Sequence, residues 1–262
     1  MDRQYTKAQL EELKGMKAAI MHPCKECGGL GYLDDDDQTV CDCLKLFRYL
    51  KELYYSNIPS EYWTLTLESL KIDGDYKGEI KDYITHLDTA CRKGLGLMFS
   101  GPQRGIGKTS SMCMIGKEAV IRGYQPFYVI AQNIIDDKFS KEKQILERIA
   151  HCDILLIDEL DKIVMANESN IPKQLENLLR GILPNKKSII IATNFTPEEI
   201  EETFKIGSLL DRYIKIIDME GQDYSKKLKD KWEERLLDSE IKFKHKILVK
   251  ESKKYHTNVR ER

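Results

Sequence analysis

The sequence predicts an α/β fold in which a parallel sheet of five strands lies between helices, with a small metal-binding module ahead of it. From residue 95 onward, short apolar runs alternate with amphipathic stretches, as parallel strands do with their crossover helices. A glycine-rich loop follows the first apolar run, and two acids end the third. Near the N-terminus, four cysteines fall between residues 24 and 43.

The composition supports a globular chain with little net charge. Of the 262 residues, 41% are hydrophobic, which is enough for a sizeable core. The 42 Lys+Arg and 43 Asp+Glu nearly cancel, which excludes a uniformly basic nucleic-acid-binding chain. Residues 226–262 nevertheless hold 13 Lys+Arg against 7 Asp+Glu. A nucleic-acid contact driven by excess charge is therefore expected only at this end.

The sequence also bears on location. The first residues, MDRQYTKAQLEELKG, carry charges throughout and have no apolar segment followed by a cleavage site, so no secretory signal is predicted. No run of about 18 apolar residues occurs, so no membrane span or membrane partner is expected. We therefore expect a cytoplasmic protein.

Two helices are predicted before the strand-rich region. Residues 7–21 repeat apolar side chains at helical intervals after Thr6, a possible N-cap residue. This helix either packs on the rest of the protein or docks a partner. Residues 44–55 form the second helical pattern, which ends before Pro59 because the residue preceding a proline avoids helical geometry.

Between these helices lies the stretch HPCKECGGLGYLDDDDQTVCDC, which predicts a metal site. It holds a CxxC pair and a CxC pair, at Cys24, Cys27, Cys41 and Cys43. Four thiolates suit tetrahedral Zn²⁺, and the glycines after the first pair permit the turns that sulfur ligation needs. In a reducing compartment the clustering favours a metal over disulfides, and the second pair argues against a redox CxxC. We predict Zn²⁺ on the four cysteines, with His22 in reserve if one thiol does not bind.

The strand-rich region supplies five strands and the helices between them. Apolar runs predict strands at residues 95–99, 127–130, 154–157, 188–192 and 213–217. Helical patterns occur at about 109–122, 131–150, 171–183 and 197–206. Continuous apolar runs of this kind are typical of parallel strands that are buried on both faces.

The loop SGPQRGIGKT, residues 100–109, predicts a phosphate site. Its glycines let the backbone approach phosphates, and the following helix N-terminus attracts negative charge. Lys108 is expected to reach the β and γ oxygens, and Thr109 to ligate Mg²⁺. The usual spacing has four residues between the first glycine and the Gly-Lys pair, whereas five follow Gly101. Either the loop carries a one-residue insertion, or residues 105–107 form the cradle and Gly101 precedes it.

Polar residues at the ends of two later strands complete the predicted site. Residues 153–159, DILLIDE, end an apolar strand in two acids, at the edge where α/β sheets place their ligands. Asp158 is predicted to hold Mg²⁺, and Glu159 to polarise the attacking water. Asn194 ends the strand SIIIATN, and its amide can hold the γ-phosphate and the water together. Each signal alone also fits an ordinary strand end that meets a turn.

The C-terminal region predicts a helix followed by a basic arm. Residues 226–240 space apolar side chains four apart along one helical stripe. The stretch IKFKHKILVK, residues 241–250, alternates apolar and Lys residues through Lys246, as a strand with one basic face or an extended arm would. Such an arm either neutralises phosphates or is a solvated tail.

Taken together, the motifs resemble those of AAA+ ATPases, and among these the DnaC-type and DnaI-type helicase loaders and their IstB-type transposition relatives. The similarity covers about residues 53–225 and includes NIPSEYWTLTLESL, GLGLMFSGPQRGIGKT, ILLIDE, IIIATN and SLLDRYIKIIDMEGQDYS. It implies an AAA+ P-loop NTPase core that binds ATP and Mg²⁺. The implied nucleotide-binding residues are Gly101, Pro102, Gly105, Ile106, Gly107, Lys108, Thr109, Ser110 and Asp158.

The resemblance also implies catalytic roles. Lys108 matches the phosphate-loop lysine, Glu159 the catalytic base, and Asn194 the first sensor. Arg212, in SLLDR, matches the arginine that reaches the nucleotide of a neighbouring subunit, so the isolated subunit is expected to be a weak ATPase. Relatives carry a second-sensor arginine where this chain has Gly-Gln-Asp-Tyr-Ser at 221–225, and Lys226 would replace it imperfectly.

The implied function is loading of a replicative helicase. Residues 1–52 are expected to form the N-terminal helix and zinc-binding module, 53–225 the AAA+ ATPase domain, and 226–262 the basic C-terminal helix and tail. The resemblance implies that the module contacts a DnaB-type helicase, that the protein grips single-stranded DNA, and that ATP drives homo-oligomerisation. The alternatives are an IstB-like transposition regulator, whose relatives commonly lack such a cysteine module, and a nucleotide-binding adaptor with little turnover.

Overall fold

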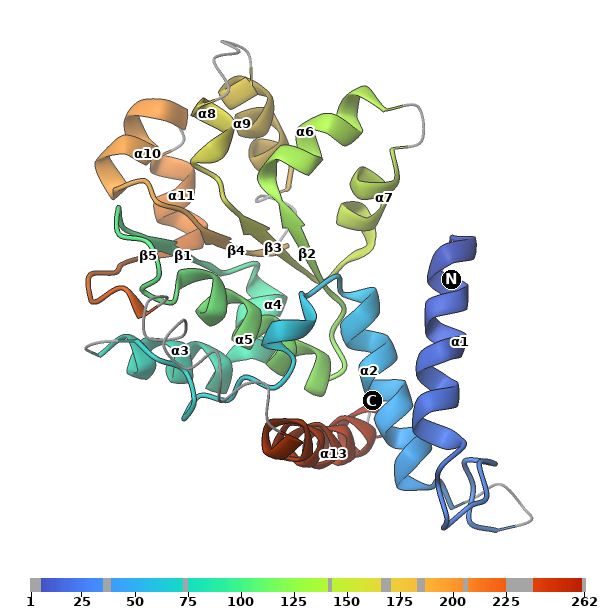
Figure 1. Ribbon diagram of the computed structural model, residues 1–262. Helices are drawn as coiled ribbons and strands as arrows, with labels where there is room; N and C mark the ends of the chain where they lie inside the picture. The colour runs from blue at the N-terminus through green and yellow to red at the C-terminus, as the bar shows by residue number, and fades with distance from the viewer. Residues whose placement is uncertain are drawn as a thin grey trace.

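The computed structural model describes residues 6–34, 39–72, 75–140, 143–165, 171–182, 187–204, 207–224 and 238–260. Within them, five parallel strands form one sheet in the order β2-β3-β4-β1-β5 (Figure 1). The strands are β1 (Gly96–Ser100), β2 (Pro126–Ile130), β3 (Ile154–Asp158), β4 (Ser188–Ala192) and β5 (Ile214–Asp218). Their bounds differ from the predicted ones by one residue at most, and the predicted α/β class is confirmed.

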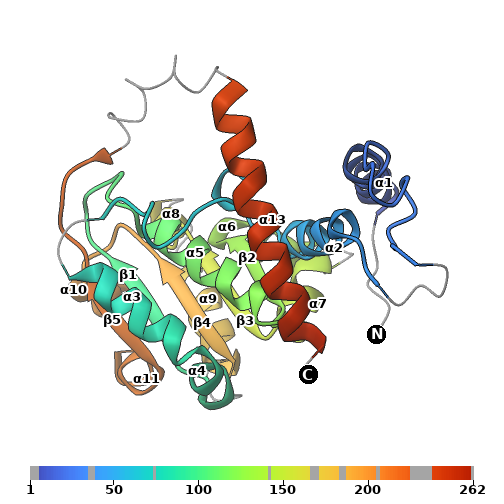
Figure 2. The same ribbon diagram turned by 90° about the horizontal axis from the view of Figure 1, so that it is seen from below.

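Helices cover both faces of the sheet (Figures 1 and 2). One face carries α3 (Tyr76–Thr85), α4 (Leu87–Lys93) and α5 (Lys108–Ile121), with α2 (Asp42–Tyr55) and α13 (Asp238–Arg260) packed outside α5. The other carries α6 (Ala131–Phe139), α7 (Gln144–His151), α8 (Lys162–Met165), α9 (Ile171–Ile182), α10 (Pro197–Phe204) and α11 (Gly207–Tyr213). A short 3-10 helix, η1 (Ser60–Tyr62), lies in the segment that leads into the core.

The helix predicted over 131–150 is two helices. Helix α6 ends at Phe139, and α7 begins at Gln144. The break is stabilised by Asp137, whose buried carboxylate accepts a hydrogen bond from the backbone N–H of Leu146 at 2.9 Å. An Asp side chain that bonds a nearby backbone N–H offers the chain an alternative to the continuous helix.

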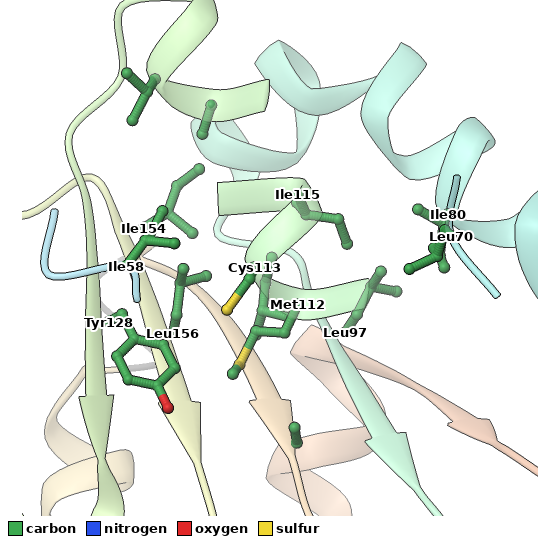
Figure 3. Close-up of a cluster of buried hydrophobic side chains, with 14 of the residues drawn as sticks. Ile58, Leu70, Ile80, Leu97, Met112, Cys113, Ile115, Tyr128, Ile154 and Leu156 are labelled. Atoms are coloured by element: carbon green, nitrogen blue, oxygen red, sulfur yellow. The ribbon is translucent and has the colours of Figure 1, made fainter. Parts of the chain in front are cut away.

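Helix α5 lies at the centre of the main core. Its buried side chains, among them Met112 and Cys113, pack over strand residues that include Leu97 and Leu156 (Figure 3). All five residues of β1, β3 and β4 are buried, as expected for strands covered on both faces. The loop at the N-terminal end of α5 is therefore attached to a tightly packed helix.

The N-terminal helix α1 (Lys7–Met21) matches its prediction. Thr6 forms a capping box with Gln9, in which each side chain accepts a hydrogen bond from the backbone N–H of the other. Leu13 and Met21 are buried, but Leu10 is 44% exposed. Helix α1 packs on α2, which supports the packing interpretation for most of its apolar stripe.

The prediction for residues 241–250 is wrong, because they lie in helix α13 and not in a strand or extended arm. The predicted helix over 226–240 lies mostly outside the described residues. Leu248 and Tyr255, seven residues apart, both pack against the main core, which is helical periodicity. Helix α13 runs across α2 and α5 (Figure 2). In the described part of the chain, no helix is both long and apolar enough to cross a membrane.

Candidate nucleotide-binding site and metal centre

The carboxyl ends of β1, β3 and β4 open on one cavity of about 710 Å³. Such a size is typical of small-molecule sites. Its lining combines the loop before α5, the residues that follow β3 and β4, and the lead-in segment around η1. The parallel sheet thus brings together at one edge the motifs that the sequence places about 50 and 90 residues apart.

The loop between β1 and α5 has the shape of a phosphate cradle. Gly107 has a left-handed φ of 99°, and a Cβ there would lie 2.5 Å from Cγ2 of Ile72, so only glycine fits without a shift. Lys108 is 7% exposed, and its Nζ donates hydrogen bonds to the carbonyl oxygens of Gly101 at 2.7 Å and Gln103 at 2.6 Å. The ammonium group is therefore held over the loop, where a phosphate group can replace the carbonyls.

Two opposing effects act on the pKa of Lys108. Burial lowers the pKa of its ammonium group, while the negative charges of Asp161 and Asp158 raise it. A buried cation between two carboxylates and a set of backbone N–H groups suits an anion that also carries a divalent metal ion.

The geometry favours the second interpretation of the loop spacing. The residues that line the cavity run from Arg104 to Ser110, whereas Gly101 and Pro102 lie outside the lining. Gly101 instead packs against the chain after β5, since a Cβ on it would lie 2.3 Å from the carbonyl oxygen of Met219. Gly101 therefore precedes the cradle and anchors it.

Asp158 and Thr109, the predicted Mg²⁺ pair, are in contact. Asp158 is 5% exposed, and its Oδ1 accepts hydrogen bonds from Oγ1 of Thr109 at 3.1 Å and from the backbone N–H of Glu159 at 2.9 Å. Its Oδ2 accepts one from the hydroxyl of Tyr128 at 2.9 Å. Burial raises the pKa of Asp158, and these hydrogen bonds oppose the rise. A hydroxyl and a carboxylate side by side are ligands that Mg²⁺ prefers, so the residues present fit the ion.

Glu159 lines the same cavity in an unusual backbone conformation. Its φ is 57°, which is uncommon for a residue with a side chain and clusters at functional sites. Its carboxylate pairs with the ammonium group of Lys162, three residues along the chain. The predicted base is thus at the cavity, but a neighbouring cation holds it.

Asn194 is oriented by a residue that the sequence analysis missed. Asp161, 3% exposed, accepts hydrogen bonds from the backbone N–H and the side-chain Nδ2 of Asn194, both at 2.9 Å. This pairing fixes which end of the amide is the nitrogen. Tyr128, the partner of Asp158, was missed as well. A second aspartate in DELD and a tyrosine within an apolar strand were the available signals.

Two features predicted from the resemblance remain, the arginine that would serve a neighbouring subunit and the second sensor. Arg212 is exposed on α11, outside the cavity lining, with its guanidinium 5.8 Å from the ring centroid of Tyr213. Its role in a neighbouring subunit stays a prediction. Tyr224, the residue before the position at which the second-sensor arginine was expected, lines the cavity, and its N–H donates to the carbonyl oxygen of Gly105 at 3.0 Å. Lys226 lies outside the described residues.

The four cysteines form one cluster, as predicted. Their sulfur atoms all lie within 4.8 Å of one another, with 3.7 Å between Cys24 and Cys41 and 3.4 Å between Cys27 and Cys43. Tetrahedral zinc with bonds of about 2.3 Å places its sulfurs about 3.8 Å apart, so the set fits the ion. His22 is the exposed C-cap of α1 and is not part of the cluster.

The backbone around Cys27 favours its thiolate form. Cys41 begins α2 as its N-cap, and its N–H donates to the carbonyl oxygen of Gly31. Burial acts to raise the pKa of Cys27, but hydrogen bonds from the N–H of Gly31 and from the Cys43 thiol lower it to about 6. A thiolate is the form that binds a metal.

Comparisons with known proteins find a family whose profile matches the central part of this chain. Residues 97–217 match the profile of the ATPase family associated with various cellular activities (AAA). No curated protein sequence matches the chain. The solved structures with a similar fold include DnaI, at 14% identity and a TM-score of 0.53, covering 66% of this chain and 98% of that one.

Domain III of the Thermotoga maritima replication initiation protein DnaA is also similar. Its identity is 19% and its TM-score 0.51, with 64% of this chain and 70% of that one covered. At these identities the likeness shows a shared fold. The predicted AAA+ core is confirmed by the family match together with the sheet order.

Proposed function

We propose that the AAA ATPase domain of this chain drives the loading of a DnaB-type replicative helicase onto single-stranded DNA. Binding of ATP would favour assembly with the helicase, and hydrolysis would favour release. The observation that carries the proposal is that one helix, α2, belongs both to the cysteine module and to the ATPase core. Leu44, in its first turn, packs in the module, whereas Tyr49 and Leu53 pack in the main core.

The end of α2 is tied to the metal-binding acid. Directly after α2, the carbonyl oxygen of Ser56 accepts a hydrogen bond from the backbone N–H of Tyr128 at 2.8 Å, and the side chain of Asn57 donates to the carbonyl oxygen of Tyr128 at 3.0 Å. The hydroxyl of Tyr128 donates to Asp158. A continuous set of contacts therefore joins the module to the nucleotide cavity, as a partner-binding switch requires.

The residues of the cavity support ATP hydrolysis. Lys108 would exchange its two carbonyl partners for β- and γ-phosphate oxygens, and Thr109 and Asp158 would hold Mg²⁺. Mg²⁺, when bound, neutralises charge that develops on the phosphates. Glu159 would leave Lys162 and accept a proton from a water molecule whose oxygen attacks the γ-phosphorus. The bond from the γ-phosphorus to the β-phosphate oxygen then breaks, which yields ADP and phosphate.

Two further residues complete this step. Asn194, held by Asp161, would orient the water and the γ-phosphate. Arg212 of a neighbouring subunit would stabilise the charge of the transition state, so hydrolysis is expected to be slow in a monomer. Because Arg212 is exposed and lies outside the cavity lining of its own chain, it is available to a neighbour.

We assign binding of the helicase to the cysteine module. Its zinc would act as a staple for the loop and not as a catalyst, because four cysteine ligands leave no open position on the metal. A role in DNA replication is supported by the fold shared with DnaI and with a domain of the replication initiation protein DnaA.

A pull-down tests the proposal. Glu159→Gln should bind ATP but not hydrolyse it, so we expect this variant to capture a hexameric replicative helicase from native extract only when ATP is added, as read by mass spectrometry. Replacing Cys24 and Cys27 by serine in the same background should abolish capture. Cys91→Ser, outside the cluster, is the matched control. Capture of a transposase instead would indicate an IstB-like regulator, and capture of neither would leave a nucleotide-binding adaptor.

A further inference from the structure

Arg104 lines the nucleotide cavity directly before the glycine cradle at residues 105–107. It is exposed, and in the described part of the chain its side chain has no hydrogen-bond or ion-pair partner. The other cations of the cavity near the strand ends are engaged. Lys108 donates to two carbonyl oxygens, and Lys162 pairs with Glu159. An arginine with no partner at an anion site is a candidate ligand-binding group.

The backbone on both sides of Arg104 is fixed. Before it, the carbonyl oxygen of Gln103 accepts a hydrogen bond from Lys108, and the side-chain Oε1 of Gln103 accepts one from the N–H of Gly221 at 3.0 Å. After it, the carbonyl oxygen of Gly105 accepts a hydrogen bond from the N–H of Tyr224 at 3.0 Å. The segment after β5 therefore holds the loop at both neighbours of Arg104, so that the residue between them stays at the cavity.

That segment is where this chain has no second-sensor arginine. Tyr224 lines the cavity there and can supply a hydroxyl but no positive charge. A nucleoside triphosphate carries about one more negative charge than a nucleoside diphosphate does. A guanidinium group can bind phosphate oxygens through two parallel hydrogen bonds, which an ammonium group cannot.

The position of Arg104 matches the terminal phosphate. Residues 105 to 109 supply the glycine cradle and the start of α5, which serve the inner phosphates. Arg104 precedes them, on the part of the loop that begins at Gly101, whose N–H donates to the carbonyl oxygen of Phe195 next to Asn194. That is the end of the cavity where the γ-phosphate and the water are expected.

We propose that Arg104 binds the γ-phosphate of ATP from within the phosphate loop and makes this site selective for triphosphates over diphosphates. The inference rests on nucleotide binding in the proposed function but not on helicase loading. Its guanidinium supplies in the same subunit a positive charge that the described residues after β5, 219–224, do not carry.

Lys71 offers a matched control. It lines the same cavity, and in the described part of the chain its side chain also has no hydrogen-bond or ion-pair partner. It lies at the other end of the loop, since a Cβ on Gly107 would be 3.2 Å from the carbonyl oxygen of Lys71. Removal of either cation lowers the positive charge of the cavity by one unit, but only Arg104 is placed at the γ-phosphate end.

The test is calorimetric titration of the full-length, zinc-loaded protein with Mg²⁺ and either ADP or the non-hydrolysable β,γ-imido analogue of ATP. We expect Arg104→Ala to weaken binding of the triphosphate analogue about 10-fold and of ADP less than about 2-fold. Arg104→Lys should recover part of the loss, because it keeps the charge but not the paired hydrogen bonds. Lys71→Ala should change both affinities by the same factor.

The retained binding of ADP shows that the variants are folded. An unchanged ratio of triphosphate to diphosphate affinity in Arg104→Ala would overturn the proposal, and so would an equal shift of that ratio in Lys71→Ala. Helicase capture does not enter this measurement. The Arg104 result therefore stands or fails independently of the pull-down with Glu159→Gln.

Discussion

The nucleotide cavity rests on strands β1, β3 and β4, which are buried along their whole length, whereas the buried core of the cysteine module consists of Met21, Val40 and Leu44. The cavity gathers polar side chains from distant parts of the sequence, whereas the module gathers four cysteines from one short stretch, residues 24–43. In the cavity, the sheet and helix α5 place those side chains without help from a ligand. In the module, three apolar residues bury too little surface to fix a loop of this length.

The difference concerns what each site contributes to its own fold. The hydrogen bonds among Thr109, Asp158 and Tyr128 form in a region that is already packed. We propose that zinc bound to the cysteine cluster supplies the missing stability, because its bonds would connect the end of α1 to the start of α2. The fold positions the residues of the nucleotide cavity, whereas the cysteine site would itself stabilise the loop around it.

Removal of zinc should therefore have the largest effect, and only on one region. We expect a chelator, or Cys24→Ser with Cys41→Ser, to unfold residues 22–34 and 39–41 with a local loss on the order of 10 kcal/mol, while the strands and α5 stay folded. Hydrogen exchange read by mass spectrometry, with zinc content measured in parallel, checks this. Cys91→Ser should keep both the zinc and the protection. Unchanged protection of the loop in the metal-free protein would contradict the comparison.

The next prediction concerns a buried ion pair that attaches helix α2, which belongs to both regions, to α5 and α13. Lys117 of α5 and Glu251 of α13 form a buried ion pair, 2.8 Å between Nζ and Oε1, and the hydroxyl of Tyr49 on α2 donates to the same carboxylate at 3.1 Å. Both charged side chains are almost inaccessible to water. Removal of one partner leaves the other charge buried, so we expect Glu251→Ala to lower the free energy of unfolding by about 3 to 5 kcal/mol.

Denaturant unfolding measures this loss, and a double variant makes the test more specific. Lys117→Met with Glu251→Leu keeps the volume and removes both charges, so it should recover most of the stability. The exposed pair of Lys14 and Glu11 is the control, since Glu11→Ala should cost less than about 1 kcal/mol. If the double variant were as unstable as the single one, the ion pair itself would supply the stability, and the loss in Glu251→Ala would not come from an unpaired buried charge.

The sequence predicts the parts of this molecule that depend on neighbours in the chain. The strands were placed within one residue because each is a continuous apolar run, and the loop, the two acids and the four cysteines follow from short spacings. Asp161 and Tyr128 were missed because their roles depend on which strands lie side by side. Helix α13 was missed because residues 241–246 alternate Lys with Ile, Phe and His, which fits the period of a strand. Its buried partners, Lys117 and Tyr49, lie 134 and 202 residues away.

The smallest expected effect is the pH dependence of stability that comes from Asp158 in the nucleotide cavity. Burial raises the pKa of Asp158 in the nucleotide-free protein. The native state then holds this proton more tightly than the unfolded state. The stability contributed by Asp158 should therefore fall as pH rises from the ordinary aspartate pKa, about 3.9, through the raised native value, and level off above it.

Asp158→Asn removes this decline, because an amide does not titrate. Without nucleotide, the variant should be equally or less stable than the wild type at low pH and gain on it as pH rises, by less than the losses predicted above. With Mg²⁺ and the triphosphate analogue the order should reverse, since only the wild type gains the stability of binding. Thermal unfolding from pH 3.5 to 7 measures both. Because the two proteins differ only at residue 158, the difference between the two curves isolates Asp158. Parallel curves would mean that the cavity folds without any cost from its metal-binding carboxylate.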